Sequence, residues 1–154
     1  MGLLSKKNKP SQKAYAVVTG AGSGIGRSFA LELAKRGGDV ICADIDLSSA
    51  QETVDLIQSM TSTSAYAVHC DVGFKESVHA LAEQAEQLLG YPVTLLINNA
   101  GVGLGGKFDE VSLEDWQWCM HVNLWGVIHG CHYFVPKFKQ QGFGAFIIVA
   151  SAAG

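Results

Sequence analysis

The residues with the clearest chemical potential in this sequence form a glycine-rich turn. Residues 19–27 read Thr-Gly-Ala-Gly-Ser-Gly-Ile-Gly-Arg and directly follow the apolar run 15–18. Glycine permits positive φ and close approach of a ligand, and a helix N-terminus supplies free N–H donors and positive potential. The spacing of Gly20, Gly24 and Gly26 matches neither Gly-x-Gly-x-x-Gly nor a Walker loop. The turn therefore predicts a phosphate-binding loop whose glycine spacing is one of the less common patterns.

Asp44 ends the next apolar run, 18 residues after Gly26. An acidic side chain at this distance accepts hydrogen bonds from the ribose hydroxyls of an adenosine, and its charge repels a 2′-phosphate. No Arg or Lys occurs in Asp44-Ile45-Asp46. We therefore expect NAD as the cofactor, with NADP less favoured. The other common role of such an acid, capping the following helix, fits Asp46 better.

Polar residues also follow the later apolar runs, at Asp71, Asn98-Asn99 and Ser151. The carboxyl ends of parallel strands meet at one edge of a sheet, where ligands of open α/β folds bind. A ligand lying across the strand ends explains why every run stops in this way.

The elements that must position these residues alternate along the chain. The apolar runs are continuous, which is typical of strands buried on both faces; they lie near 15–18, 40–43, 66–70, 93–97 and 144–150. Helices are expected between them, including one opened by a capping box at Ser49-x-x-Glu52 and a long one from Ser112 through about Lys139. The long helix is apolar on nearly all sides, so we expect more than one neighbour to cover it. The order βαβαβαβαβ predicts an α/β fold, a doubly wound, Rossmann-like parallel sheet with helices on both faces.

The composition fits one globular domain and excludes several classes of function. The 154 residues are 48% hydrophobic and 16% charged, with a net charge of −3, so we expect no nucleic-acid partner. No apolar stretch is long enough to predict a membrane partner. The lysine-rich residues 1–13 are interpreted as a flexible leader, and 14–154 as a dinucleotide-binding domain. Four scattered cysteines favour a reduced, cytoplasmic protein, and we expect no metal site from His129, Cys131 and His132.

Together these motifs resemble the short-chain dehydrogenase/reductase family over residues 14–154. The resemblance rests on five segments in order: the cofactor turn with Thr19, Gly20, Ser23, Gly24, Ile25 and Gly26; the adenine contact Asp71-Val72; the signature Asn98-Asn99-Ala100-Gly101; the helical segment around Asn123; and the strand that ends at Ser151.

The resemblance implies hydride transfer between a nicotinamide cofactor and a carbonyl or alcohol substrate. It assigns Ser151 to orientation of the substrate oxygen and Asn123 to a proton relay through water. A Tyr made basic by a Lys four residues later moves the proton in this family. The string Tyr133-x-x-x-Lys137 precedes Ser151 and contains Pro136, so we interpret it as a decoy. The resemblance also implies a homodimer or homotetramer.

The catalytic Tyr and Lys are expected about a dozen residues beyond Ser151, whereas the sequence ends at Gly154. We therefore expect five strands of a longer sheet, in an incomplete and weakly active or inactive portion of an oxidoreductase. A catalytically silent dinucleotide-binding module is the alternative. A methyltransferase that uses S-adenosylmethionine also has a glycine turn and an acid after its second strand, but the segments at Asn98–Gly101 and Asn123 argue against it.

Overall fold

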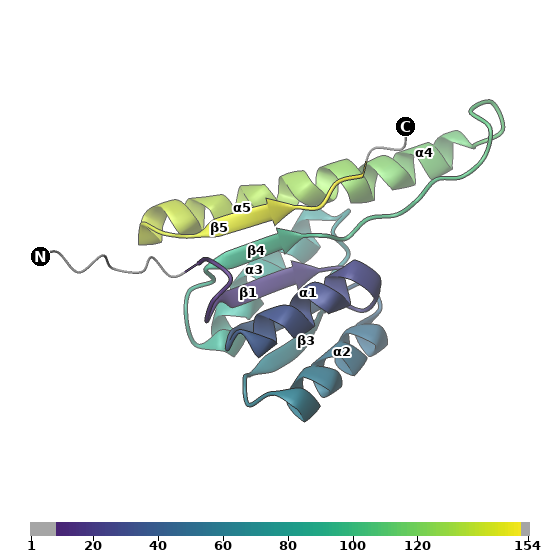
Figure 1. Cartoon of the computed structure of the whole chain (residues 1–154). Helices are drawn as coiled ribbons and strands as arrows, with labels where there is room; N and C mark the ends of the chain where they lie inside the picture. The colour runs from purple at the N-terminus through teal and green to yellow at the C-terminus, as the bar shows by residue number, and fades with distance from the viewer. Residues whose placement is uncertain (1–8, 152–154) are drawn as a thin grey trace, which may run out of the picture.

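The computed structural model describes residues 9–151 and contains a five-stranded parallel sheet flanked by helices (Figure 1). The predicted leader 1–13 lies mostly outside the described residues. The strands are β1 (Tyr15–Thr19), β2 (Asp39–Asp44), β3 (Ala65–His69), β4 (Leu95–Asn98) and β5 (Ala145–Ile148). Their spatial order is β3-β2-β1-β4-β5. The chain thus winds outward from β1 in both directions, which confirms the doubly wound fold and puts its switch point between β1 and β4.

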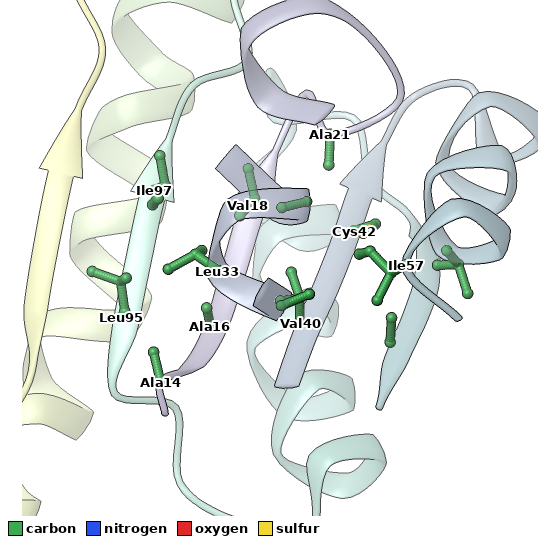
Figure 2. Packing of buried hydrophobic residues seen from close by; sticks show 14 of the residues in the cluster. Ala14, Ala16, Val18, Ala21, Leu33, Val40, Cys42, Ile57, Leu95 and Ile97 are labelled. Carbon is green, nitrogen blue, oxygen red and sulfur yellow. The ribbon is translucent and has the colours of Figure 1, made fainter. Parts of the chain in front are cut away.

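The helices cover both faces of this sheet. They are α1 (Gly24–Lys35), α2 (Leu47–Met60), α3 (Lys75–Leu89), α4 (Leu113–Met120), the π-helical segment η1 (His121–Trp125) and α5 (Gly126–Gln141). Leu33 of α1 and Ile57 of α2 pack on one face, over side chains that include Val18 (Figure 2). Helices α3 and α5 pack on the other face, over Val17. Since Val17 and Val18 are both fully buried, β1 is apolar on both sides, as its continuous run predicts.

The predicted capping box at the start of α2 is wrong. Helix α2 begins earlier, because the Asp46 carboxylate accepts the N–H groups of Ser48 and Ser49 at 3.0 and 3.2 Å. The Ser49 hydroxyl also donates to Asp46, at 2.8 Å. This bond first, and then the two N–H bonds, lower the pKa of Asp46 below its ordinary value. Glu52 is therefore not needed at the helix terminus and pairs with Arg27 of α1 instead.

The single long helix expected from Ser112 is interrupted. Ser112 does cap it, since its hydroxyl accepts the N–H of Asp115 at 3.0 Å. The π-helical segment η1 then separates α4 from α5. Among the described residues, none in α4 is buried, whereas α5 packs against α3, β4 and β5, so the expected cover by more than one neighbour is found for α5 and not for α4. Helix α5 buries a single stripe, and its two glycines there allow close approach, because a Cβ at Gly130 would lie 2.2 Å from Asn98 Oδ1.

The four cysteines differ in burial, which leads to a prediction about their reactivity. Burial raises the pKa of the Cys42 thiol to about 12 and that of Cys70 to about 11, whereas Cys119 and Cys131 are partly exposed. At pH 8 this lowers the thiolate fraction of Cys42 by about a thousandfold. In a timed reaction with an aromatic disulfide reagent, Cys119 and Cys131 should react in the native protein, and Cys42 and Cys70 only after denaturant is added. Equal labelling of Cys42 and Cys119 in the native protein would contradict the burial of Cys42.

Candidate functional site

A pocket of about 410 Å³ opens where the carboxyl ends of β1, β2, β3 and β4 meet, next to the switch point. Ten of the residues predicted to contact the cofactor line it: Gly20, Ser23, Gly24, Ile25, Asp44, Asp71, Val72, Asn99, Ala100 and Gly101. Five further lining residues were not predicted to contact the cofactor: Ile45, Cys70, Val102, Trp118 and Val122. The predicted residues Thr19, Gly26, Asn98, Asn123 and Ser151 do not line the pocket.

The glycine turn forms one side of the pocket. Gly20 and Gly24 have φ of +66° and +52°, a region that favours glycine. Ser23 is the N-cap residue of α1, and its side chain makes no capping hydrogen bond. Free N–H groups at the start of α1 therefore remain available to an anion in the pocket. Gly26 lies behind this surface, where a Cβ would come within 2.0 Å of the Gly20 carbonyl oxygen.

Asp44 forms an acidic wall next to the turn. Its Oδ2 accepts the N–H of Gly22 at 2.8 Å, and its Oδ1 accepts the N–H of Asp46 at 3.0 Å. A carboxylate has about four acceptor positions, so this geometry fixes the side chain and leaves acceptor capacity for a ligand. Among the described residues, no Lys or Arg forms an ion pair with Asp44. The wall is thus negatively charged and suited to hydroxyl donors.

Thr19 and Asn99 join β1 to the loop after β4. The buried Thr19 hydroxyl accepts the N–H groups of Asn99 and Ala100 at 3.0 and 3.1 Å. The Asn99 side chain donates back to the Thr19 carbonyl at 3.0 Å. Asn98 points elsewhere, since its amide is buried against α5 and lies 3.8 Å from the sulfur of Cys131. The two adjacent asparagines therefore support different parts of the fold.

Asn123 lies in the π-helical segment η1 and holds the loop that follows β4. Its side-chain amide makes two hydrogen bonds of 2.8 Å with the backbone of Val102, donating to the carbonyl and accepting from the N–H. Isolated π-helical turns occur frequently at functional sites. Ser151 follows β5 and is exposed. Within residues 9–151, no hydrogen bond joins Ser151 to Asn123.

His129 is a supporting residue that the sequence did not reveal as such. Its Nδ1 lies 2.9 Å from the carbonyl oxygen of Val72, which lines the pocket. Because a carbonyl can only accept, Nδ1 carries the proton. Tyr133 and Lys137 lie outside the pocket lining, where the ammonium of Lys137 pairs with Glu86 at 2.7 Å. Over residues 9–151, no three His, Cys, Asp or Glu side chains are arranged to hold a metal ion.

Comparison with known proteins identifies the family. The sequence model of the short chain dehydrogenase family matches residues 14–154. The chain belongs to this family. Its resemblance to the short-chain dehydrogenases at the level of motifs is thereby confirmed, and so is the Rossmann-like sheet that they share. None of the helices that the structure describes has the length and apolar character required to cross a membrane.

Individual short-chain dehydrogenases are similar over most of this chain. It is 40% identical to a cyclohexanol dehydrogenase of Acinetobacter over 96% of its own length and 58% of that protein. A short-chain dehydrogenase/reductase from Burkholderia phymatum, solved in complex with NAD, is 39% identical with a TM-score of 0.87, over 93% of this chain and 50% of that one. An alcohol dehydrogenase from Thermococcus sibiricus, complexed with 5-hydroxy-NADP, is 27% identical with a TM-score of 0.81, over 86% and 56%. The chain spans about half the length of these relatives.

Proposed function

We propose that this chain binds NAD as the cofactor-binding part of an oxidoreductase that interconverts an alcohol and a carbonyl compound. The observation that carries the proposal is the pocket at the switch point, where the glycine turn lies beside the carboxylate of Asp44, which pairs with no Lys or Arg among the described residues. A dinucleotide needs both an anion site and acceptors for its ribose hydroxyls, and this pocket offers the two together.

Each part of the pocket fits one part of the cofactor. The N–H groups at Ser23, Gly24 and Ile25 suit the pyrophosphate, and Asp44 suits the ribose of the adenosine. Asp71 and Val72, with Asn99, Ala100 and Gly101 opposite, suit the adenine and the chain that leads to the nicotinamide. Thr19 holds this wall from behind, Asn98 packs the end of β4 against α5, and Gly26 lets the turn close. When bound, the cofactor supplies or accepts the hydride.

We assign the preference for NAD over NADP to the charge of Asp44. The relatives with NAD and with an NADP derivative leave both cofactors open for the family. A carboxylate that is already fixed by two backbone N–H groups cannot turn away from a 2′-phosphate without breaking those bonds. The resulting repulsion favours NAD.

We propose roles in catalysis for two residues beyond the pocket. Ser151 orients the oxygen of the substrate, and Asn123, locked to Val102, anchors a water relay for the proton. Tyr133 and Lys137 take no part, because Lys137 is paired with Glu86 away from the pocket. Among residues 9–151, no Tyr–Lys pair lines the pocket, and we propose that this part of the chain supplies no general acid–base catalysis, which is worth about 10²–10⁴-fold in rate.

We also propose self-association and a reducing, cytoplasmic location. Exposed apolar side chains on α4, η1 and α5, such as Trp118, Trp125 and Ile128, support a homodimer or homotetramer. Four free cysteines support a reducing compartment.

A titration of the 154-residue chain with NADH, followed by cofactor fluorescence, tests the proposed function. We expect saturable binding, weaker binding of NADPH, and no competition by S-adenosylmethionine. Addition of a panel of ketones should give at most trace oxidation of the bound NADH. A folded chain that binds no dinucleotide would contradict the proposal, and robust turnover would contradict the exclusion of Tyr133 and Lys137.

A further inference from the structure

Two side chains outside the pocket hold the glycine turn from behind. Thr53 of α2 is completely buried, and its hydroxyl donates to the carbonyl oxygen of Ala21 at 2.8 Å. The same hydroxyl accepts a hydrogen bond from Nε of Arg27 at 3.0 Å. One buried oxygen thus connects the turn, α1 and α2.

Arg27 extends this connection to the next residue of the turn. Its Nη2 donates to the carbonyl oxygen of Gly22 and to Glu52 Oε2, the latter at 3.0 Å. The planar guanidinium can donate in several fixed directions at once, which a Lys cannot do. The side chain of Arg27 is only 27% exposed, so its bonds to the turn and to Thr53 are partly shielded from solvent, whereas Glu52 is 64% exposed.

As a result, all four backbone polar groups of Ala21 and Gly22 are hydrogen-bonded. The N–H of Ala21 donates to the carbonyl of Ala43 at 3.1 Å, and the N–H of Gly22 donates to Asp44 Oδ2 at 2.8 Å. The two carbonyl groups accept from Thr53 and Arg27. Neither peptide can rotate without breaking a bond, and the next three residues are those whose N–H groups border the pocket.

We propose that Arg27 and Thr53 are positioning residues that hold the turn in its phosphate-binding conformation. They set the affinity for the pyrophosphate without contacting it. This inference rests on the proposed function, because the ligand is the dinucleotide assigned there. A site that is ordered before binding avoids the cost of ordering it on binding, so the bonds behind the turn contribute to affinity.

The simpler role for these side chains is to join α1 to α2, and ligand fragments distinguish the two roles. ADP-ribose contains the pyrophosphate, whereas adenosine lacks it. If the turn is no longer held in position, the affinity for ADP-ribose falls and the affinity for adenosine stays nearly unchanged. Loss of general stability instead lowers the melting temperature and affects both ligands only through the fraction of folded protein.

The decisive variant is Thr53→Val, which keeps the shape of the side chain and removes its hydroxyl. We expect the Kd for ADP-ribose and NADH to rise about tenfold, because Ala21 and Arg27 each lose a partner. Thr53→Ser restores the hydroxyl and should bind within about twofold of the wild type. Arg36→Lys, at the C-cap of α1, is the matched control for an Arg-to-Lys exchange at Arg27, since Arg36 forms its ion pair with Glu32 away from the pocket.

Calorimetric titrations with ADP-ribose and adenosine, and melting curves of every variant, decide the outcome. Wild-type affinity of Thr53→Val for ADP-ribose would overturn the inference, as would equal losses for both ligands. If Thr53→Val does not fold, Arg27→Lys serves in its place. This variant keeps the positive charge that faces Glu52 but lacks the planar guanidinium with its several donors. It should show the same selective loss of affinity for ADP-ribose. If the wild type binds no dinucleotide, the proposed function fails first and the inference with it.

Discussion

Gly26→Ala is expected to abolish measurable NADH binding and to destabilise the chain by about 3 kcal/mol, at the upper end of the usual cost of overpacking. The new Cβ would lie 2.0 Å from the Gly20 carbonyl oxygen and 2.5 Å from Asn99 Nδ2. The first of these atoms belongs to the backbone and cannot move aside as a flexible side chain can. Relief of the clash must therefore displace the turn itself.

The displacement reaches the pocket directly, because Gly20 lines it and Asn99 joins the turn to the loop after β4. A shift of about 1 Å in a binding geometry can cost about 100-fold, so we expect at least this increase in the Kd for NADH. Fluorescence titration and urea unfolding measure the two effects. Gly103→Ala is the matched control, since a Cβ there meets no atom within 4 Å. A Gly26→Ala protein with wild-type affinity and stability would contradict the packing behind the turn.

The sequence was sufficient for the fold because its signals are local. Continuous apolar runs indicated buried parallel strands, and the glycines at 20, 24 and 26 indicated the turn between β1 and α1. The start of α2 illustrates the limit at a helix terminus, because the sequence offered both Asp46 and Ser49 as caps. The spacing of Ser49 and Glu52 is correct for a capping box, but the Asp46 carboxylate accepts the N–H groups of Ser48 and Ser49, so the helix begins before Ser49.

The supporting residues of the site could not be predicted in this way. Arg27 and Thr53 are 26 positions apart, and their hydrogen bond exists only because α1 and α2 pack side by side. The opposite directions of Asn98 and Asn99 follow from the alternation of side chains at the end of β4. The side chain of Asn123, in the π-helical segment, makes its two short bonds to Val102, 21 positions away. Such long-range contacts leave no periodic signal in one sequence.

The exposed apolar surface is a second outcome that depends on context. Continuous apolar runs such as those of the last helix and of β5 are typical of buried elements, whereas Phe146, Ile147 and Ile148 of β5 are exposed in the described chain. A continuous apolar run indicates a surface that is commonly packed against another element. It does not identify which element covers that surface.

Asp44→Asn should reverse the preference between the two nicotinamide cofactors. The variant keeps one oxygen that can accept the N–H of Gly22, so the turn retains its position. It removes the negative charge and replaces one acceptor with a donor. A hydrogen bond to a charged group is worth about 1.5–3 kcal/mol, so the Kd for NADH should rise about 10- to 100-fold. NADPH loses the repulsion of its 2′-phosphate, and its affinity should stay constant or improve.

The ratio of the two affinities is the informative quantity, because a general loss of structure lowers the affinities for NADH and NADPH by the same factor. Titrations with NADH and NADPH at low and high salt measure it, and the change in ratio should shrink at high salt if charge is the cause. Asp55→Asn on the exposed face of α2 makes the same change of charge outside the pocket lining and should leave the ratio unaltered. If Asp44→Asn weakens NADH and NADPH by the same factor, Asp44 acts through the turn and not through the ribose. Cofactor selectivity would then have to be assigned to another residue of the pocket wall, of which Ile45 is the nearest in sequence.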